Sequence, residues 1–318
     1  MEAGSRVVAL GGGHGLAASL AALRRVVTAP DGLTAIVTVA DNGGSSGRLR
    51  REFGVLPPGD LRQALAALCG DDEWGSTWAR VLQHRFASSG DLDRHAVGNL
   101  LIVALWELLG EQVAGLEWVG RLLGAQGRVI PMTLAPLDIT ASVRGLDPAD
   151  PSRPVTVRGQ VEVATTRGHV DSVQLDPADP AACPEALAAV ADADWAVLGP
   201  GSWFTSVIPH LLVPGLRSAL AVSQARKAVT LNLAPQRGET DGFAPETHLE
   251  VLAAHAPDVR IDLVLADRGS VADPDRLRGC AADLGAELVL ADVASSDGSP
   301  RHDPAKLADA YARMLARA

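Results

Sequence analysis

Two glycine-rich segments near the N-terminus combine the residue types that bind phosphate groups. The first, Gly11 to Gly15, has the sequence GGGHG and follows the apolar run 7–10. The second, residues 41–50 with the sequence DNGGSSGRLR, follows the apolar run 34–40. Glycine lets backbone amides approach a ligand closely, and a helix that begins after such a loop adds a partial positive charge. Two loops of this kind at neighbouring strand ends predict a site for a phosphorylated ligand.

The second segment is the more distinctive because it places a carboxylate among hydroxyl and guanidinium groups. Asp41 ends the preceding strand, where an acid holds ribose hydroxyls in dinucleotide-binding folds. It is also the one residue that we expect to hold a divalent cation. A solvated surface loop would explain the glycines, but not their combination with two serines and two arginines. The other candidate ligand-binding residues of the segment are Asn42, Gly43, Gly44, Ser45, Ser46 and Arg48.

The first segment matches neither of two common nucleotide-binding motifs. Leu16 stands at the third glycine position of the dinucleotide fingerprint, and no Gly-Lys-Ser/Thr follows as in a P-loop. A tight strand-to-helix turn without a ligand would give the same pattern. We keep the whole segment as candidate ligand-binding residues, namely Gly11, Gly12, Gly13, His14 and Gly15.

Further polar segments follow predicted strands or open predicted helices. Asp60 is expected to cap a helix over 60–69, and Arg62 places a cation in its first turn, where the helix dipole favours an anion. An anionic ligand nearby would compensate that charge. No catalytic residue is assigned, since no Ser-His-Asp arrangement can be argued from spacing alone. The remaining candidate ligand-binding residues are Asn99 (an expected helix cap), Gly199, Gly201, Ser202 (an expected helix cap), Asn232, Gln236 and Arg301.

Short apolar runs alternate with helical patterns along most of the chain. The runs that predict buried strands are 7–10, 34–40, 195–198, 228–231, 261–265 and 287–290. The patterns that predict helices are 16–27, 60–69, 100–109, 113–123 and 305–316, the last one capped by Asp303. This alternation predicts an α/β fold with a doubly wound, mostly parallel, Rossmann-like sheet.

Residues 128–175 break the alternation. Apolar and polar residues alternate with a period of two over 137–143 and over 155–163. Such patterns are typical of antiparallel strands with one face in water. We interpret this part as a β-rich antiparallel insertion within a single domain that spans residues 1–318.

Composition excludes several classes of protein. The net charge of −10 and the aromatic content of 3% argue against nucleic-acid binding. No apolar run reaches the ~18 residues of a membrane helix, and the first residues lack a signal-peptide pattern. The sequence thus predicts a cytoplasmic protein without membrane insertion, and it leaves homo-oligomers open. The three cysteines are far apart and have no metal-ligand spacing.

Taken together, these segments resemble the YvcK-type gluconeogenesis factor family, a branch of the CofD-like superfamily of 2-phospho-L-lactate transferase. The resemblance covers nearly the whole chain. It implies a Rossmann-like core, binding of a nucleotide sugar such as UDP-N-acetylglucosamine, and a role in carbon flux and cell shape. Arg301 matches the family's C-terminal basic position for sugar-nucleotide binding. The matching motifs are GGGHGL (11–16), VADNGGSSGRLR (39–50), PPGDLR (57–62), GNLL (98–101), GPGSWFTSVIPHLLV (199–213), GETDGF (238–243) and RHD (301–303).

Two departures from the family fall in the glycine-rich segments: the family usually has Thr where His14 stands and Asp where Asn42 stands. A third is Pro304, which replaces a frequent hydroxyl residue. Loss of a second carboxylate beside Asp41 weakens a divalent-metal site. We therefore expect a regulatory protein that binds a nucleotide sugar and requires no cofactor. The alternative is a Mg²⁺-dependent transferase that acts on a nucleotide-activated lactate and a deazaflavin acceptor. A nicotinamide-dependent dehydrogenase is disfavoured by the missing third glycine.

The expected ligand pose uses both glycine-rich segments. The diphosphate would lie on the amides of residues 11–15 and 43–46, with Arg48 and Arg62 offsetting its charge. Residues 199–202 and 236–241 would contact the sugar. This pose requires that the two segments share one cleft.

Overall fold

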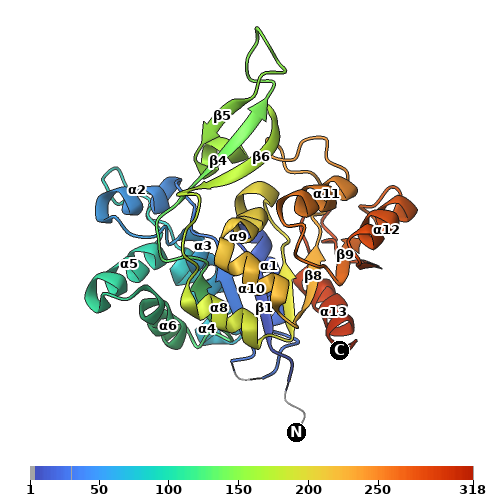
Figure 1. Cartoon of the computed structure of the whole chain (residues 1–318). Helices are drawn as coiled ribbons and strands as arrows, with labels where there is room; N and C mark the ends of the chain where they lie inside the picture. Colours follow the sequence, from blue (N-terminus) through green and yellow to red (C-terminus); the bar gives the residue numbers. More distant parts are fainter. Residues whose placement is uncertain (1–3, 30, 318) are drawn as a thin grey trace.

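A seven-stranded parallel sheet forms the centre of the molecule in this computed structural model, which describes residues 4–29 and 31–317 (Figure 1). The strand order is β10-β9-β8-β7-β1-β2-β3, and each pair of neighbours is parallel. This confirms the predicted α/β fold class. The strands are β1 (Val7–Gly11), β2 (Leu33–Val37), β3 (Arg128–Pro131), β7 (Trp195–Leu198), β8 (Arg226–Thr230), β9 (Leu263–Asp267) and β10 (Glu287–Ala291).

The strand order reverses between β1 and β7. From β1 the chain moves outward through β2 to β3, and from β7 it moves outward in the other direction through β8 and β9 to β10. Loops that leave the carboxyl ends of β1 and β7 therefore diverge to opposite faces of the sheet. Ligands of open α/β sheets bind in the crevice that opens at such a point.

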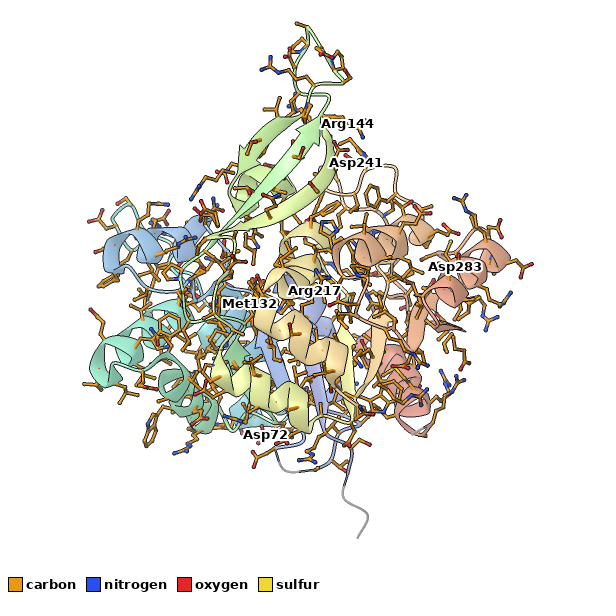
Figure 2. The ribbon with its side chains drawn as sticks, viewed as in Figure 1. Asp72, Met132, Arg144, Arg217, Asp241 and Asp283 are labelled. Carbon is orange, nitrogen blue, oxygen red and sulfur yellow. The ribbon has the colours of Figure 1, made fainter. Side chains whose placement is uncertain are left out.

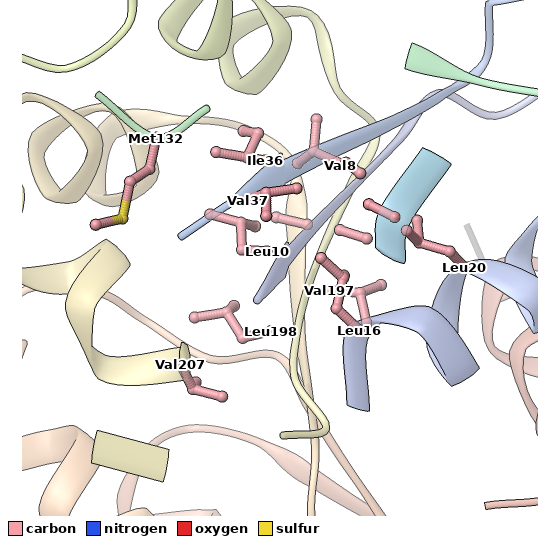
Figure 3. Close-up of a cluster of buried hydrophobic side chains, with 14 of the residues drawn as sticks. Val8, Leu10, Leu16, Leu20, Ile36, Val37, Met132, Val197, Leu198 and Val207 are labelled. Atoms are coloured by element: carbon pink, nitrogen blue, oxygen red, sulfur yellow. The ribbon is translucent and has the colours of Figure 1, made fainter. Parts of the chain in front are cut away.

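Helices cover the two faces of the sheet and bury its apolar strands. Every residue of β1, β2 and β7 is buried, as expected for central parallel strands. Figure 3 shows Leu16 and Leu20 of α1 beside side chains of these strands. Each fully buried aliphatic side chain of this kind contributes about 1.5–3 kcal/mol. The resulting core holds the carboxyl ends of the strands rigidly.

The five predicted helices are present with shifted boundaries, and further helices lie between them. Asp303 accepts hydrogen bonds from the amides of Ala305 and Lys306, which confirms the predicted cap of the last helix. The helices are α1 (Gly13–Leu23), α2 (Gly44–Phe53), α3 (Gly59–Ala67), α4 (Glu73–Gln83), α5 (Val97–Leu109), α6 (Gln112–Leu123), α7 (Gln160–Ala164), α8 (Pro184–Asp192), the π-helix η1 (Trp203–Val207), α9 (Ile208–Leu212), α10 (Pro214–Val222), α11 (Pro245–His255), α12 (Pro274–Asp283) and α13 (Pro304–Leu315).

Within residues 4–29 and 31–317, no single helix combines the length and the apolar composition needed to cross a bilayer. The consecutive helical segments Trp203–Leu212 and Pro214–Val222 meet the criteria only as a pair, and they are bent by 76° at their junction.

A second, antiparallel sheet stands apart from the first, with strand order β5-β4-β6. Figure 1 shows it projecting from the body on the side opposite the N-terminus, and Arg144 in Figure 2 marks the outer end of β4. Its strands are β4 (Asp138–Arg144), β5 (Val155–Arg158) and β6 (His169–Asp176). The strand β4 matches the predicted run 137–143, and β6 is a third strand beyond the two alternating runs that the sequence indicates.

Two details of the prediction for 128–175 are wrong. Residues 128–131 form β3, which pairs in parallel with β2 at the edge of the main sheet. Residues 155–163 are not one strand, because β5 ends at Arg158 and the helix α7 follows. Gly159 has a φ of +106°, a conformation open to glycine, and it turns the chain out of the strand.

Candidate functional site

A cavity of about 870 Å³ opens at the carboxyl ends of β1 and β7, where the strand order reverses. Its volume lies within the range of small-molecule sites. The walls come from the loops after β1, β7 and β8, from α7, and from the segment before α13. The predicted site residues that line it are Gly12, Gly13, His14, Gly15, Asp41, Asp60, Gly201, Ser202, Asn232, Gln236 and Arg301.

The first glycine-rich segment brings the N-terminus of α1 to the cavity wall. Gly13 has a φ of +58°, and an ideal Cβ on Gly15 would lie 2.3 Å from the carbonyl oxygen of Pro200. Two loops therefore pack backbone against backbone, which only glycine permits. Gly12 precedes α1 without a side-chain cap, and the first turn holds no acidic residue. The first-turn amides of an uncapped helix favour an anionic ligand.

Asp60 is the most perturbed carboxyl group of the cavity. Only 7% of the residue is exposed, and its Oδ2 is buried without a hydrogen-bond partner. Burial, and next the charge of Asp41, raise the pKa of Asp60 to about 7, although the Gly13 amide opposes the shift. The predicted capping role is wrong: α3 begins at Gly59 after Pro58, so Asp60 lies inside the first turn and lines the cavity instead.

Asp41 and Asp60 form a pair of neighbouring carboxylates at one side of the cavity. Oδ1 of Asp41 accepts the Gly43 amide at 2.9 Å. No group of three or more His, Cys, Asp or Glu side chains gathers in the part of the chain that the structure describes. Two carboxylates suit Mg²⁺, which keeps several waters and takes further oxygens from substrate phosphates. The donor set therefore fits a Mg²⁺ ion that is shared with a phosphorylated ligand.

Apart from Asp41, the second glycine-rich segment is mostly helical and lies outside the cavity lining. The helix α2 starts at Gly44, and Ser45 is buried against the start of α5. Oγ of Ser45 accepts from Nδ2 of Asn99 at 3.0 Å and lies 3.0 Å from Nδ1 of His95. Asn99 belongs to the interior of α5, whose N-cap position is Ala96, so its predicted capping role is wrong as well.

Arg62 completes this buried polar cluster. It is 2% exposed, and its Nε donates to Oδ1 of Asn99 at 2.9 Å. Burial lowers the pKa of the Arg62 guanidinium to about 10. The groups of the cluster satisfy one another, so we assign them to the fold and not to a ligand. Arg48 is also occupied, since it donates to the backbone carbonyls of Asp91 and Asp93.

Ten predicted site residues thus lie outside the cavity lining, and we do not place the diphosphate on the second segment. Arg48 and Arg62, which were expected to offset the charge of the diphosphate, form hydrogen bonds within the protein instead. We therefore do not place them in contact with the ligand. The ten residues are Gly11, Asn42, Gly43, Gly44, Ser45, Ser46, Arg48, Arg62, Asn99 and Gly199.

Asn232 ties together the loops that follow β7 and β8. Its Oδ1 accepts the Gly201 amide at 3.0 Å, and its Nδ2 donates to the Gly201 carbonyl at 2.8 Å. Nearby, Nε2 of Gln236 donates to Oγ of Ser202 at 3.2 Å, while its Oε1 is without a partner. This side of the cavity therefore offers hydroxyl and amide groups that suit a hydroxyl-rich ligand.

Glu239 is a buried acid that sequence reasoning did not single out. It is 3% exposed, and burial raises its pKa to about 7 against the opposing effects of Thr205, Ser202 and the Phe204 amide. The Glu239 carboxyl group thus lies at the N-terminal end of η1, next to the cavity residues Ser202 and Thr205. The motif GETDGF was the available signal, but nothing in its composition distinguishes a buried acid from a solvated loop.

Arg237 and Arg301 supply positive charge at the cavity. Both residues are exposed, both line the cavity, and neither forms a salt bridge within the described residues. Arg237 was predicted only as part of a loop. His302, beside Arg301, also lines the cavity; burial lowers its pKa to about 4, and its Nε2 has no partner. A neutral ring of this kind offers an acceptor to a ligand N–H or O–H group.

The helix α7 forms a further wall, with Gln160, Val161, Ala164 and Thr165 in the lining. Sequence reasoning missed it because the alternation over 155–163 indicated a strand. The antiparallel sheet therefore carries one wall of the cavity.

Comparison with known proteins matches residues 7–298 to the family described as 2-phospho-L-lactate transferase CofD. The chain is 52% identical to a Mycobacterium tuberculosis protein that carries the name gluconeogenesis factor provisionally; the match covers 98% of this chain and 90% of that protein. It is 36% identical to the gluconeogenesis factor of Listeria monocytogenes, over 99% and 97% of the two chains. A crystal structure of a UPF0052 family member from Bacillus halodurans has a TM-score of 0.84 and 31% identity, covering 96% and 98%.

Proposed function

This chain belongs to the CofD family, and from that membership together with the cavity we propose that it binds a nucleotide sugar such as UDP-N-acetylglucosamine. Its relatives are named gluconeogenesis factors, so the bound state would regulate carbon flux. The family resemblance described above adds a proposed role in envelope synthesis. The single observation that carries the proposal is the meeting, in one cavity, of the uncapped first turn of α1 with two unpaired guanidinium groups. That combination suits the charge of a diphosphate.

The diphosphate lies in this proposal against the first turn of α1. His14 and Gly15 have amides without an acceptor inside the helix. Arg237 and Arg301 line the same cavity and add charge-assisted bonds. Each such bond contributes about 1.5–3 kcal/mol. Four or five suffice for micromolar binding, which takes about 8 kcal/mol.

The sugar and the nucleoside would contact the walls that offer neutral polar groups. Gln236 and His302 line this cavity, and Oε1 of Gln236 and Nε2 of His302 are buried without a hydrogen-bond partner among the described residues. Sugar and ribose hydroxyls, and a base N–H group, are donors that fit them. Buried acceptors without partners reject ligands that lack such donors.

A Mg²⁺-dependent transferase is the second candidate, favoured by the pair Asp41 and Asp60. A solvent-shielded carboxyl with a raised pKa beside a second carboxyl is typical of functional sites. Mg²⁺ held there would neutralise phosphate charge. Consumption of a nucleotide-activated lactate that depends on both Mg²⁺ and a deazaflavin acceptor would establish this function.

Calorimetric titration tests the binding proposal. UDP-N-acetylglucosamine, GDP and NAD are titrated into the wild type, Arg301→Ala and the control Arg313→Ala, which removes an exposed arginine of α13. We expect the UDP-sugar to bind the wild type and the control alike. Arg301→Ala should weaken binding about tenfold, the loss of one charge-assisted bond, at an unchanged melting temperature. Binding of NAD alone, or unchanged affinity in Arg301→Ala, would contradict the proposal.

A further inference from the structure

Asn42 lies outside the cavity, but it makes two hydrogen bonds to the helix α7 that walls it. Its Oδ1 accepts the backbone amide of Val161 at 3.0 Å. Its Nδ2 donates to Oε2 of Glu162 at 2.7 Å. The residue sits in the turn between β2 and α2, 119 positions before Val161. Both bonds therefore join the main sheet to the antiparallel insertion.

The chemistry of these two bonds requires an amide at position 42. The helix α7 presents one donor, the Val161 amide, and one acceptor, the Glu162 carboxylate. An amide side chain offers one acceptor and one donor and so matches both. A carboxylate at position 42 would lie against the Glu162 carboxylate, and like charges at that spacing repel.

Close packing around Asn42 leaves little freedom for another arrangement. An ideal Cβ on Gly43 would lie 2.7 Å from Cγ2 of Val161. One on Gly159 would lie 2.1 Å from Oε2 of Glu162 and 2.5 Å from Nδ2 of Asn42. Glycines on both sides thus permit the two loops to touch. No side chain of its own N-cap residue caps α7. The Asn42 side chain instead accepts the amide of Val161, the second residue of the helix.

At its other end α7 abuts the loop that contains the cavity residues Gln236 and Arg237. An ideal Cβ on Gly238 would lie 2.7 Å from the carbonyl oxygen of Ala164. The five-residue helix therefore spans the distance between the turn after β2 and the loop after β8. The helix is too short to be stable alone, so its packing against β4 and η1 and the contacts at its two ends fix its position.

We propose that Asn42 is a positioning residue, whose amide fastens α7 to the rim of the cavity and so holds the wall formed by Gln160, Val161, Ala164 and Thr165 in place. The role of Asn42 in holding α7 does not depend on a bound ligand. Its consequence for ligand affinity rests on the proposed function. Asn42 contacts α7 and lies outside the cavity lining, so the effect of a carboxylate at position 42 should depend on Glu162.

Five variants test that dependence: Asn42→Asp, Asn42→Leu, Glu162→Gln and the double variants Asn42→Asp/Glu162→Gln and Asn42→Leu/Glu162→Gln. Hydrogen–deuterium exchange over residues 159–165 is measured without ligand, and affinity for UDP-N-acetylglucosamine is measured by calorimetry. We expect Asn42→Asp and Asn42→Leu each to raise exchange in this segment and to lower affinity roughly three- to tenfold. Glu162→Gln alone should resemble the wild type, since the introduced amide still accepts from Asn42.

The double variant Asn42→Asp/Glu162→Gln shows whether the effect of Asn42→Asp comes from repulsion by Glu162. The amide introduced at position 162 can donate to the carboxylate introduced at position 42, so exchange and affinity should return to within about twofold of wild type. In contrast, Asn42→Leu/Glu162→Gln should recover neither the wild-type exchange nor the wild-type affinity, because the leucine side chain forms no hydrogen bond. Unchanged exchange in Asn42→Asp would overturn the proposal, and so would weakened affinity that Glu162→Gln does not rescue, because that result assigns Asn42 to the ligand. If the wild type binds no nucleotide sugar, the proposed function fails while the exchange data still decide the role of Asn42.

Discussion

The carboxyl group of Asp60 occupies the space that a side chain at Gly12 would need. An ideal Cβ on Gly12 would lie 2.6 Å from Oδ2 of Asp60 and 2.4 Å from Cγ2 of Thr38. The glycine that precedes α1 and the acid in the first turn of α3 thus meet beneath the cavity. The backbone of Gly12 is extended, with a φ of −163°, so contact and not backbone strain imposes glycine here.

Gly12→Ala should destabilise the protein by about 1–3 kcal/mol, because the new methyl group displaces Thr38 and Asp60 from a packed site. Denaturation by urea measures the change. Gly279→Ala on the exposed face of α12 is the matched control, since a Cβ there meets nothing within 4 Å, and it should be neutral or stabilising. Equal effects of the two substitutions would show that residue 12 has room for a side chain.

Asp60→Asn should stabilise the protein at high pH while weakening its ligand binding. Burial and the charge of Asp41 raise the pKa of Asp60 from 3.8 to about 7. The folded protein therefore holds this proton more tightly than the unfolded chain, and the associated stability, complete below about pH 4, is lost as the pH rises through 7. Asp60→Asn does not lose stability in this way. Its free energy of unfolding should therefore exceed that of the wild type by roughly 1–3 kcal/mol at pH 8.

Urea unfolding at pH 5, 6, 7 and 8 checks this trend, with the exposed Asp309→Asn on α13 as the control for loss of one negative charge. An advantage of Asp60→Asn that shrinks as the pH rises would contradict the stated sign. Gain of stability together with loss of affinity would identify Asp60 as a group retained for function at a cost in stability.

Strands and the general place of the site could be predicted from the sequence because both depend on local pattern. The run 195–198 is apolar on both faces, and β7 occupies those same residues. Asp303 before Pro304 is a local capping signal, and the structure has that cap. Residues 11–15 continue from a buried strand, and four of these five residues line the cavity.

The role of each polar residue could not be predicted, because it depends on packing between distant segments. Ser45, Asn99 and Arg62 have the composition of a phosphate site, yet they satisfy one another inside the protein. Nothing local distinguishes such a cluster from a ligand site. Likewise, Val161 and Val163 continue the alternation of β5, and only the positive φ of Gly159 reveals that a helix begins there.

A crystal structure of the complex with UDP-N-acetylglucosamine would show where the diphosphate binds. We predict that the diphosphate lies within hydrogen-bond distance of the His14 and Gly15 amides, with the Arg301 guanidinium in contact with it. A ligand bound at another surface, or bound in the cavity with those amides unengaged, would overturn the proposed binding site.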